Sequence, residues 1–162
     1  VPKNIFHYYY NVQMKGSQGF GDDTTLNGIR LHCSKYNRLS SNPQTHTIES
    51  GSRPWGSWSM DAWCPDGYLT AFQLKVEQVE GEGDDTAANN LKFRCSIGHI
   101  IEGHGGPWGG YGSWSHLCSD GGICGLQTKI ERPQKAGDDT ALNDVRFYCC
   151  SKFSHTPYLI LK

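Results

Sequence analysis

The chain has 162 residues, a formal net charge of −1, and a charged fraction of 19%. This near-neutral balance gives no basis for general nucleic-acid affinity, and no apolar run is long enough to span a membrane as a helix. The 20 glycines and the low charged fraction favour a turn-rich β protein. The length suits one domain, covering residues 1–162.

One motif occurs three times along the chain, at residues 21–33, 83–95 and 137–149. Each copy opens with Gly-Asp-Asp-Thr, in which the glycine and the aspartates favour a turn. Each copy then alternates apolar and polar residues and ends in a cysteine. Because a period of two is typical of a half-buried strand, each copy predicts a turn followed by a strand. Repetition of the unit predicts three equivalent parts of one fold.

Further strands are predicted around each motif. The segments with strand character before the motifs are residues 10–15, 72–77 and 126–131, preceded by shorter apolar segments at 45–49 and 99–102. Tryptophan-glycine segments at 54–58 and 107–114 follow the short ones. No helical periodicity is found, so the sequence predicts an all-β fold.

The repeats defined in this way cover about residues 1–44, 45–98 and 99–150, followed by a tail at 151–162. The first repeat has no short leading strand, no tryptophan segment and no leading cysteine. We therefore expect the first sheet to be incomplete. The tail could fill part of the edge that this leaves, because bare sheet edges invite aggregation; the alternative is a frayed end.

The seven cysteines favour disulfides over zinc ligands, since no Cys-x-x-Cys pair is present. Matching positions between repeats predicts Cys64–Cys95, Cys118–Cys149 and Cys124–Cys150, although Cys149 and Cys150 could exchange partners. Cys33 is left over, either as a buried thiol or in an intermolecular bridge. A disulfide framework implies a secreted, extracellular protein. No metal and no cofactor are expected.

The three Gly-Asp-Asp-Thr motifs, the paired tryptophan-glycine segments, residues 124–131 (CGLQTKIE) and the adjacent Cys149 and Cys150 carry a family resemblance. Over about residues 10–150 the chain resembles the vitelline membrane outer layer protein 1 family. The resemblance implies a β-prism of type I, with three Greek-key antiparallel sheets around a pseudo-three-fold axis. It also implies a secreted protein of the egg vitelline membrane, with a link to transfer among N-acetylglucosamine oligomers.

The candidate glycan-binding residues are the acids and amides of the three motifs. They are Asp22, Asp23, Asp84, Asp85, Asp138 and Asp139, with Asn27, Asn89 and Asn143. Their functional interpretation is binding of sugar hydroxyls, acid–base work in glycosyl transfer, or a calcium ion. The structural interpretation is that each pair of acids only caps its own turn, which explains all three copies.

The glutamates and the tryptophans also have a functional and a structural interpretation. Glu77 and Glu131 are the plausible acids for a glycosidase-like pair, against a role as solvated charges at strand ends that they would share with Glu49 and Glu102. The tryptophans could stack on sugar rings. Their recurrence in register with the repeats instead favours packing in the core; they are Trp55, Trp58, Trp63, Trp108 and Trp114.

These observations predict a monomeric structural component of an egg coat or a similar secretion. Its partners would be coat glycoproteins or glycans that contain N-acetylglucosamine. Two alternatives stay open: weak transfer among N-acetylglucosamine oligosaccharides, and a lectin-like carbohydrate-binding module. Catalysis is the less expected role, because none of the common catalytic motifs is present.

Overall fold

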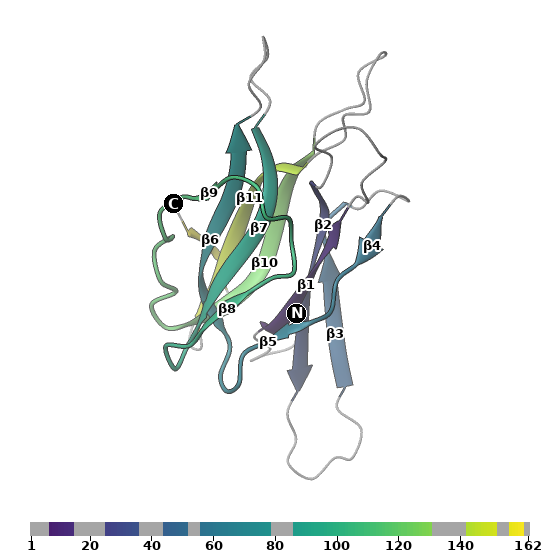
Figure 1. Ribbon diagram of the computed structural model, residues 1–162. Coiled ribbons are helices and arrows are strands. Elements are labelled where there is room, and N and C mark those ends of the chain that lie inside the picture. The colour runs from purple at the N-terminus through teal and green to yellow at the C-terminus, as the bar shows by residue number, and fades with distance from the viewer. Residues whose placement is uncertain are drawn as a thin grey trace.

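The computed structural model describes residues 7–14, 25–35, 44–51, 56–78, 86–130, 142–151 and 156–160. Throughout these residues the secondary structure consists of strands, which form three antiparallel sheets. Figure 1 shows the first sheet, in purple and blue, beside the other two sheets, whose strands run from teal through green to yellow. The all-β fold is confirmed, and three sheets around one core are the arrangement of a β-prism. No membrane-spanning helix is found in the described part of the chain.

The first and second sheets have the same strand order. The first contains β1 (His7–Met14), β2 (Leu26–Lys35), β3 (Gln44–Glu49) and β4 (Ser57–Trp58) in the order β3-β2-β1-β4, and β5 (Ala62–Trp63) also pairs with β1. The second contains β6 (Leu69–Gln78), β7 (Thr86–Cys95), β8 (Ile100–Glu102) and β9 (Gly110–Tyr111) in the order β8-β7-β6-β9. In both, the fourth strand returns to lie beside the first, which defines a Greek key.

The third sheet has only the first three of these strands in the described residues. It contains β10 (Gly121–Ile130), β11 (Leu142–Ser151) and β12 (Tyr158–Ile160), in the order β10-β11-β12. The prediction that the first sheet is incomplete is therefore wrong, because this sheet has five strands. It is the third sheet that lacks a fourth strand, beside β10, among the described residues.

The error lies in where the sequence repeats were divided. The sequence spacing places residues 45–49 in the second repeat. In the structure, however, β3 pairs with β2 of the first sheet, with Arg30 opposite Glu49. Likewise β8 pairs with β7 of the second sheet, with Lys92 opposite Glu102. Each sheet thus consists of a hairpin together with the segments that follow it in the chain.

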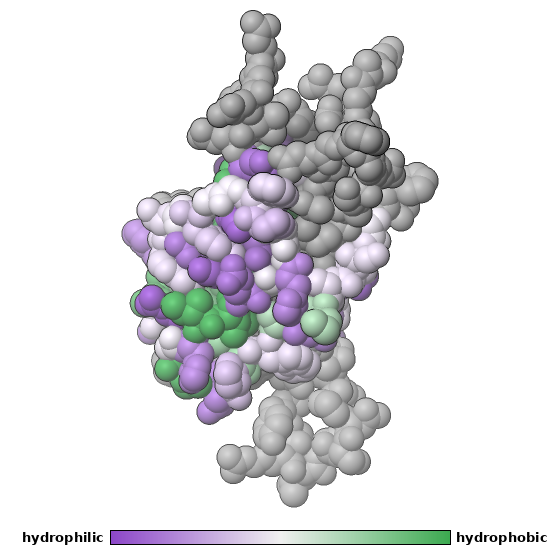
Figure 2. Space-filling view, viewed as in Figure 1, coloured by the Kyte–Doolittle hydropathy of each residue, from purple (hydrophilic) through white to green (hydrophobic). Residues whose placement is uncertain are grey.

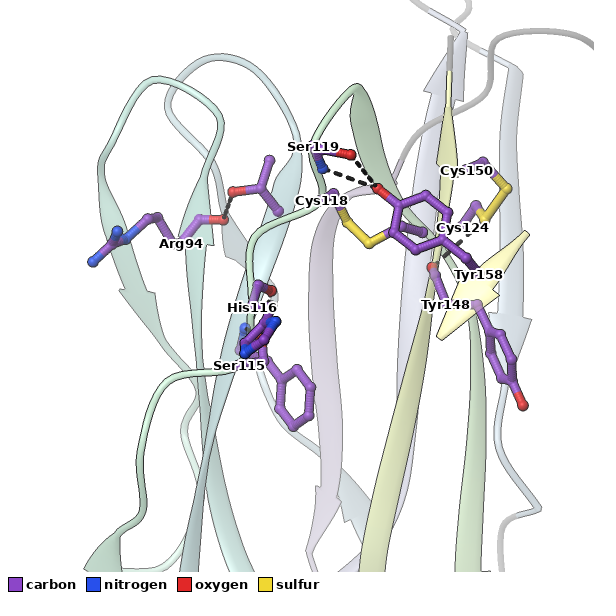
Figure 3. The surroundings of a disulfide bond; sticks show 12 residues. Arg94, Ser115, His116, Cys118, Ser119, Cys124, Tyr148, Cys150 and Tyr158 are labelled. Carbon is purple, nitrogen blue, oxygen red and sulfur yellow. Dashed lines mark hydrogen bonds between the residues drawn. A yellow bond between two sulfur atoms is a disulfide. The ribbon is translucent and has the colours of Figure 1, made fainter. Parts of the chain in front are cut away.

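The C-terminal tail joins the third sheet. β12 pairs with β11, placing Ile160 opposite Phe147, and Ile160 is 4% exposed. The proposal that the tail fills an edge of the first sheet is therefore wrong, and its strand is not frayed. Figure 3 shows Tyr158 of this strand with its hydroxyl oxygen accepting a hydrogen bond from the Ser119 backbone N–H at 2.9 Å.

The core lies where the sheets meet, and the predicted alternation places side chains there. The apolar residues of the three motifs are buried, at 3% exposure or less: Ile29, Leu31, Cys33, Leu91, Phe93, Cys95, Val145, Phe147 and Cys149. The Phe147 ring of the third sheet contacts Phe72 and Phe93 of the second, with centroids 4.6 Å and 5.1 Å away. Edge-to-face packing of these rings joins the two sheets.

The three disulfides join the predicted pairs. Cys118 lies on the segment that follows β9, where its backbone N–H donates to the Thr70 carbonyl of β6 at 2.9 Å. Its bridge to Cys149 therefore ties the edge of the second sheet to the third. Cys124–Cys150 joins β10 to β11 within the third sheet (Figure 3). Cys33 is a buried free thiol and donates to the His46 carbonyl at 3.1 Å.

Gly109 shows how tightly the segment around β9 lies against β6. It has a φ of 85°, and a Cβ added there would fall on the carbonyl oxygen of Val76. Gly109→Ala should therefore lower the free energy of unfolding by about 1–3 kcal/mol, measured by denaturant titration. Gly110→Ala is the matched control, because a Cβ at Gly110 meets nothing within 4 Å. Equal effects of the two substitutions would contradict this close packing.

Candidate functional site

The asparagines of the three motifs all lie in β-bulges. In the first hairpin, Leu26 and Gly28 each have a partner on the opposite strand, but Asn27 between them has none in the ladder. Asn89 and Asn143 are left out of the ladder at the same point of the second and third hairpins. A bulge inserts one unpaired residue and bends its strand. The repeated asparagine therefore marks a bend in the second strand of each hairpin.

Burial removes two of these asparagines from the surface. Asn27 is 3% exposed and Asn89 is 0% exposed, whereas Asn143 is half-buried. The Asn89 side-chain amide donates to Glu77 Oε2 at 3.1 Å, and its backbone carbonyl accepts from the Gly106 N–H at 2.8 Å. Asn89 thus holds its bulge and the neighbouring loop, and the buried side chains of Asn27 and Asn89 do not face solvent. The paired aspartates lie outside the described residues: Asp22, Asp23, Asp84, Asp85, Asp138 and Asp139.

The outer face of the second sheet carries a cluster centred on Tyr111. The Lys92 ammonium lies 4.2 Å from the ring centroid of Tyr111, and the Lys75 ammonium lies 5.5 Å from it. The Tyr111 hydroxyl donates to Glu102 Oε1 at 2.5 Å. Burial, together with the hydrogen bond to this carboxylate, raises the pKa of the Tyr111 phenol above its ordinary value. Cation, aromatic ring and carboxylate hold one another in place.

The first sheet repeats this cluster with different residues. The Arg30 guanidinium lies 3.7 Å from the ring centroid of Trp58, and Arg30 Nε donates to Glu49 Oε2 at 2.7 Å. Arg30 faces Glu49 across the ladder as Lys92 faces Glu102. The two sheets therefore present the same triad of cation, aromatic ring and carboxylate on their outer faces.

The described tryptophans lie on the outside of the prism, so the prediction of core packing is wrong for them. Trp63 and Trp108 are each 52% exposed, whereas Trp58 and Trp114 are half-buried. Arg94 lies 5.2 Å from the ring centroid of Trp114. The tryptophans recur in register with the repeats, but this recurrence is the same whether the rings pack in the core or cover outward-facing cations. Trp55 lies outside the described residues.

The described glutamates are each engaged in a different place. Glu49 pairs with Arg30, Glu77 accepts from Asn89, and Glu102 accepts from Tyr111. Glycosyl transfer needs two carboxyl groups that converge on one bond, and among the residues that the structure describes these three do not form such a pair. Glu131 lies outside them.

Exposed apolar side chains add to the outer surface. Figure 2 shows an apolar area, in green, on the face that carries β8. Ile97 and Ile100 are 52% and 54% exposed. The outer surface therefore combines exposed rings, aliphatic groups and cations, which suits contact with glycans or matrix proteins. No group of three potential metal-ligating side chains occurs within the described ranges.

The Tyr111 cluster predicts a specific response to alkaline pH. The folded protein keeps the Tyr111 proton above pH 10, where the unfolded chain begins to release it. The stability that Tyr111 contributes is thus present below about pH 10 and declines as the pH rises above it. Tyr111→Phe should leave the phenolate absorbance titration unchanged near pH 10. Loss of a group that ionises there would contradict the assignment.

The family model described as "Vitelline membrane outer layer protein I (VOMI)" matches residues 1–152. A mouse protein named "Vitelline membrane outer layer protein 1 homolog" is 51% identical over 152 residues, covering 93% of this chain and 74% of the relative. The human protein of the same name is 51% identical over 151 residues, covering 92% of this chain and 73% of the relative.

Proposed function

The chain belongs to the vitelline membrane outer layer protein I family, and from that premise we propose that it is a secreted structural component of an egg coat or a similar extracellular layer. The three disulfides support a secreted setting, because such bridges persist in oxidising compartments. Its expected partners are coat glycoproteins and glycans that contain N-acetylglucosamine.

The observation that carries the glycan contact is the exposure of Trp63 and Trp108, each 52% exposed. An exposed indole offers a flat apolar face for a sugar ring and a polar edge for its hydroxyls. The aspartates of the three Gly-Asp-Asp-Thr motifs remain candidates for binding sugar hydroxyls. In this proposal the exposed rings supply stacking and these aspartates supply hydrogen bonds.

The alternative is that the protein transfers units among the N-acetylglucosamine oligomers that it binds. Glu49, Glu77 and Glu102 give this alternative little support, since each of them is engaged by a different partner. A catalytic pair would instead draw on acids outside the described residues, such as Glu131, Asp84 and Asp138. A structural role with glycan contacts is therefore the proposal that the described residues favour.

The test is a titration of the whole chain with N-acetylchito-oligosaccharides, read by tryptophan fluorescence. Trp108→Ala should weaken binding about 3- to 10-fold, the range expected for one aromatic contact. Ile97→Ala is the matched control, because it removes an equally exposed apolar side chain without a ring. Absence of saturable binding would refute the glycan contact.

Mass spectrometry of the same incubation separates binding from catalysis. Unchanged oligosaccharide lengths are expected for a structural or lectin-like protein. The appearance of longer oligomers would support transfer instead, and their loss in Asp84→Asn/Asp138→Asn would assign that activity to the Gly-Asp-Asp-Thr motifs.

A further inference from the structure

The two most exposed of the described tryptophans lie at opposite edges of the second sheet. Trp63 is on β5, and β5 contacts β8, which forms one edge of this sheet. Trp108 lies two residues before β9, which forms the other edge. Neighbouring strands of a sheet are about 4.8 Å apart, so the axes of β8 and β9 are about 14 Å apart. The two rings therefore belong to different edges, with β7 and β6 between them.

The two tryptophans are also separated along the strands. Trp63 precedes Cys64, which is bridged to Cys95, and Cys95 faces Leu69 at the beginning of β6. β9, in contrast, pairs with β6 at Val76. The seven residues from Leu69 to Val76 extend over about 23 Å at the usual rise of a strand. Figure 1 shows β5 near the lower end of the prism and β9 near the upper end. The rings thus lie at diagonally opposite corners of the sheet, more than about 20 Å apart.

The backbone that carries Trp63 is held on both sides. Trp63 itself pairs with Tyr9 of β1, and the residue before it, Ala62, is buried. The residue after it, Cys64, is fixed by the disulfide to Cys95. The exposed ring therefore projects from a well-anchored position.

The backbone that carries Trp108 is held in a different way. The carbonyl of the preceding residue, Pro107, accepts from the Lys75 ammonium at 2.7 Å. The following residue, Gly109, lies directly against the backbone of Val76, as described above. A binding group that is already fixed loses little conformational freedom when a ligand arrives. Both exposed rings are thus presented to solvent in a preorganised way.

The other described tryptophans differ from these two. Trp58 and Trp114 are half-buried, and each covers a cation: Arg30 at 3.7 Å and Arg94 at 5.2 Å from the ring centroid. Their aromatic faces therefore already serve a contact within the protein. Among the described indoles, Trp63 and Trp108 have the most surface left for a sugar ring.

We propose that the chain is bivalent for glycans and cross-links neighbouring glycan chains through Trp63 and Trp108. This inference rests on the proposed function, because each of its two contacts is the stacking contact proposed above. One sugar ring stacks on each indole, and the distance between the corners prevents a disaccharide from reaching both. On a dense glycan layer, binding at the first corner makes binding at the second intramolecular, so avidity rises without any new contact. A monomer with two such corners can connect glycan chains without forming an oligomer.

The stoichiometry of the unmodified chain is the first measurement. The probe is the disaccharide of N-acetylglucosamine, and equilibrium dialysis should show two molecules bound per chain at saturation. One bound molecule per chain would overturn the proposal of two corners and leave a single glycan contact in place. No saturable binding would refute the proposed function itself.

Cross-linking is measured as the turbidity of beads that carry the same disaccharide. The unmodified chain should aggregate the beads, whereas Trp63→Leu and Trp108→Leu should each bind to the beads but aggregate them at least about 10-fold less. Leucine keeps apolar bulk at an exposed position, so thermal melting should show that both variants stay folded. Leu117→Ala is the matched control, because it removes an equally exposed apolar side chain without a ring and should aggregate the beads normally.

The single variants also exclude cross-linking by self-association. A dimer with one glycan contact per chain would still aggregate the beads after loss of the tryptophan that is not used. Undiminished aggregation by either Trp63→Leu or Trp108→Leu would therefore overturn the proposal, as would binding of the unmodified chain to the beads without aggregation. In both cases the glycan contact of the proposed function would stand.

Discussion

Phe147→Ala is expected to lower the free energy of unfolding by about 3–5 kcal/mol. Phe147 is 0% exposed, and its ring contacts Phe72 and Phe93 at centroid distances of 4.6 Å and 5.1 Å. Truncation removes the apolar contact between the second and third sheets and leaves a cavity that rigid strands cannot close. Denaturant titration with the disulfides intact measures the change.

Arg146→Ala is the matched control for this substitution. It changes the adjacent residue on the same strand, whose side chain is exposed. Its effect should stay within about 0.5 kcal/mol. A loss of less than about 1 kcal/mol for Phe147→Ala would show that Phe147 is not central to the packing of the two sheets.

Removal of the bridge between Cys118 and Cys149 is expected to have an effect of similar size. The bridge spans 31 residues of sequence and ties the edge of the second sheet to the third. Cys118→Ala/Cys149→Ala should therefore lower the free energy of unfolding by about 3–4 kcal/mol, since the unfolded chain regains the freedom of a long loop. Thermal and denaturant unfolding without reductant measure this difference.

Cys33→Ala provides the comparison for the bridge. Cys33 is a buried free thiol that donates a hydrogen bond to the His46 carbonyl at 3.1 Å. Its removal should cost about 1 kcal/mol, the loss of one weak hydrogen bond and a small buried group. If the double alanine variant lost no more stability than Cys33→Ala, the bridge between the sheets would not constrain the fold as described.

The strands and the disulfides could be predicted because they depend on local patterns. Alternation in residues 29–33 identifies which side chains point inward, and Leu31 and Cys33 are indeed buried. Matching positions between repeats identifies equivalent cysteines, so that Cys64–Cys95 and Cys118–Cys149 follow from one another. The first prediction requires only the two-residue period of a strand, and the second requires only that positions in the repeats can be matched.

The division of the chain into sheets could not be predicted in the same way. A repeat determines the length of a unit but not where the unit begins. Residues 45–49 follow one hairpin and precede the next, and only the pairing of β3 with β2 shows which hairpin they join. For this reason the missing strand was placed in the first sheet instead of the third.

The outward position of the tryptophans and the burial of Asn27 and Asn89 could not be predicted, for a different reason. Period-two alternation does not hold in glycine-rich segments, so the sequence does not show whether Trp108 faces inward. The outward-facing cations Arg30 and Lys92 could have indicated that aromatic rings lie on the outer face, because each of them contacts such a ring. Asn89 looked like a polar ligand group, but it is the extra residue of a bulge, and local sequence gives no register from which to find one.

The proposed function depends above all on contact between glycans and the tryptophans of the outer face. The most direct measurement is the set of indole N–H signals in ¹H–¹⁵N spectra of the whole chain, recorded with and without N-acetylchito-oligosaccharide. We expect the signals of Trp63 and Trp108 to shift with saturation, while the signal of Trp58, held against Arg30, moves least. Shifts that leave Trp63 and Trp108 unchanged, or no shifts at all, would contradict it.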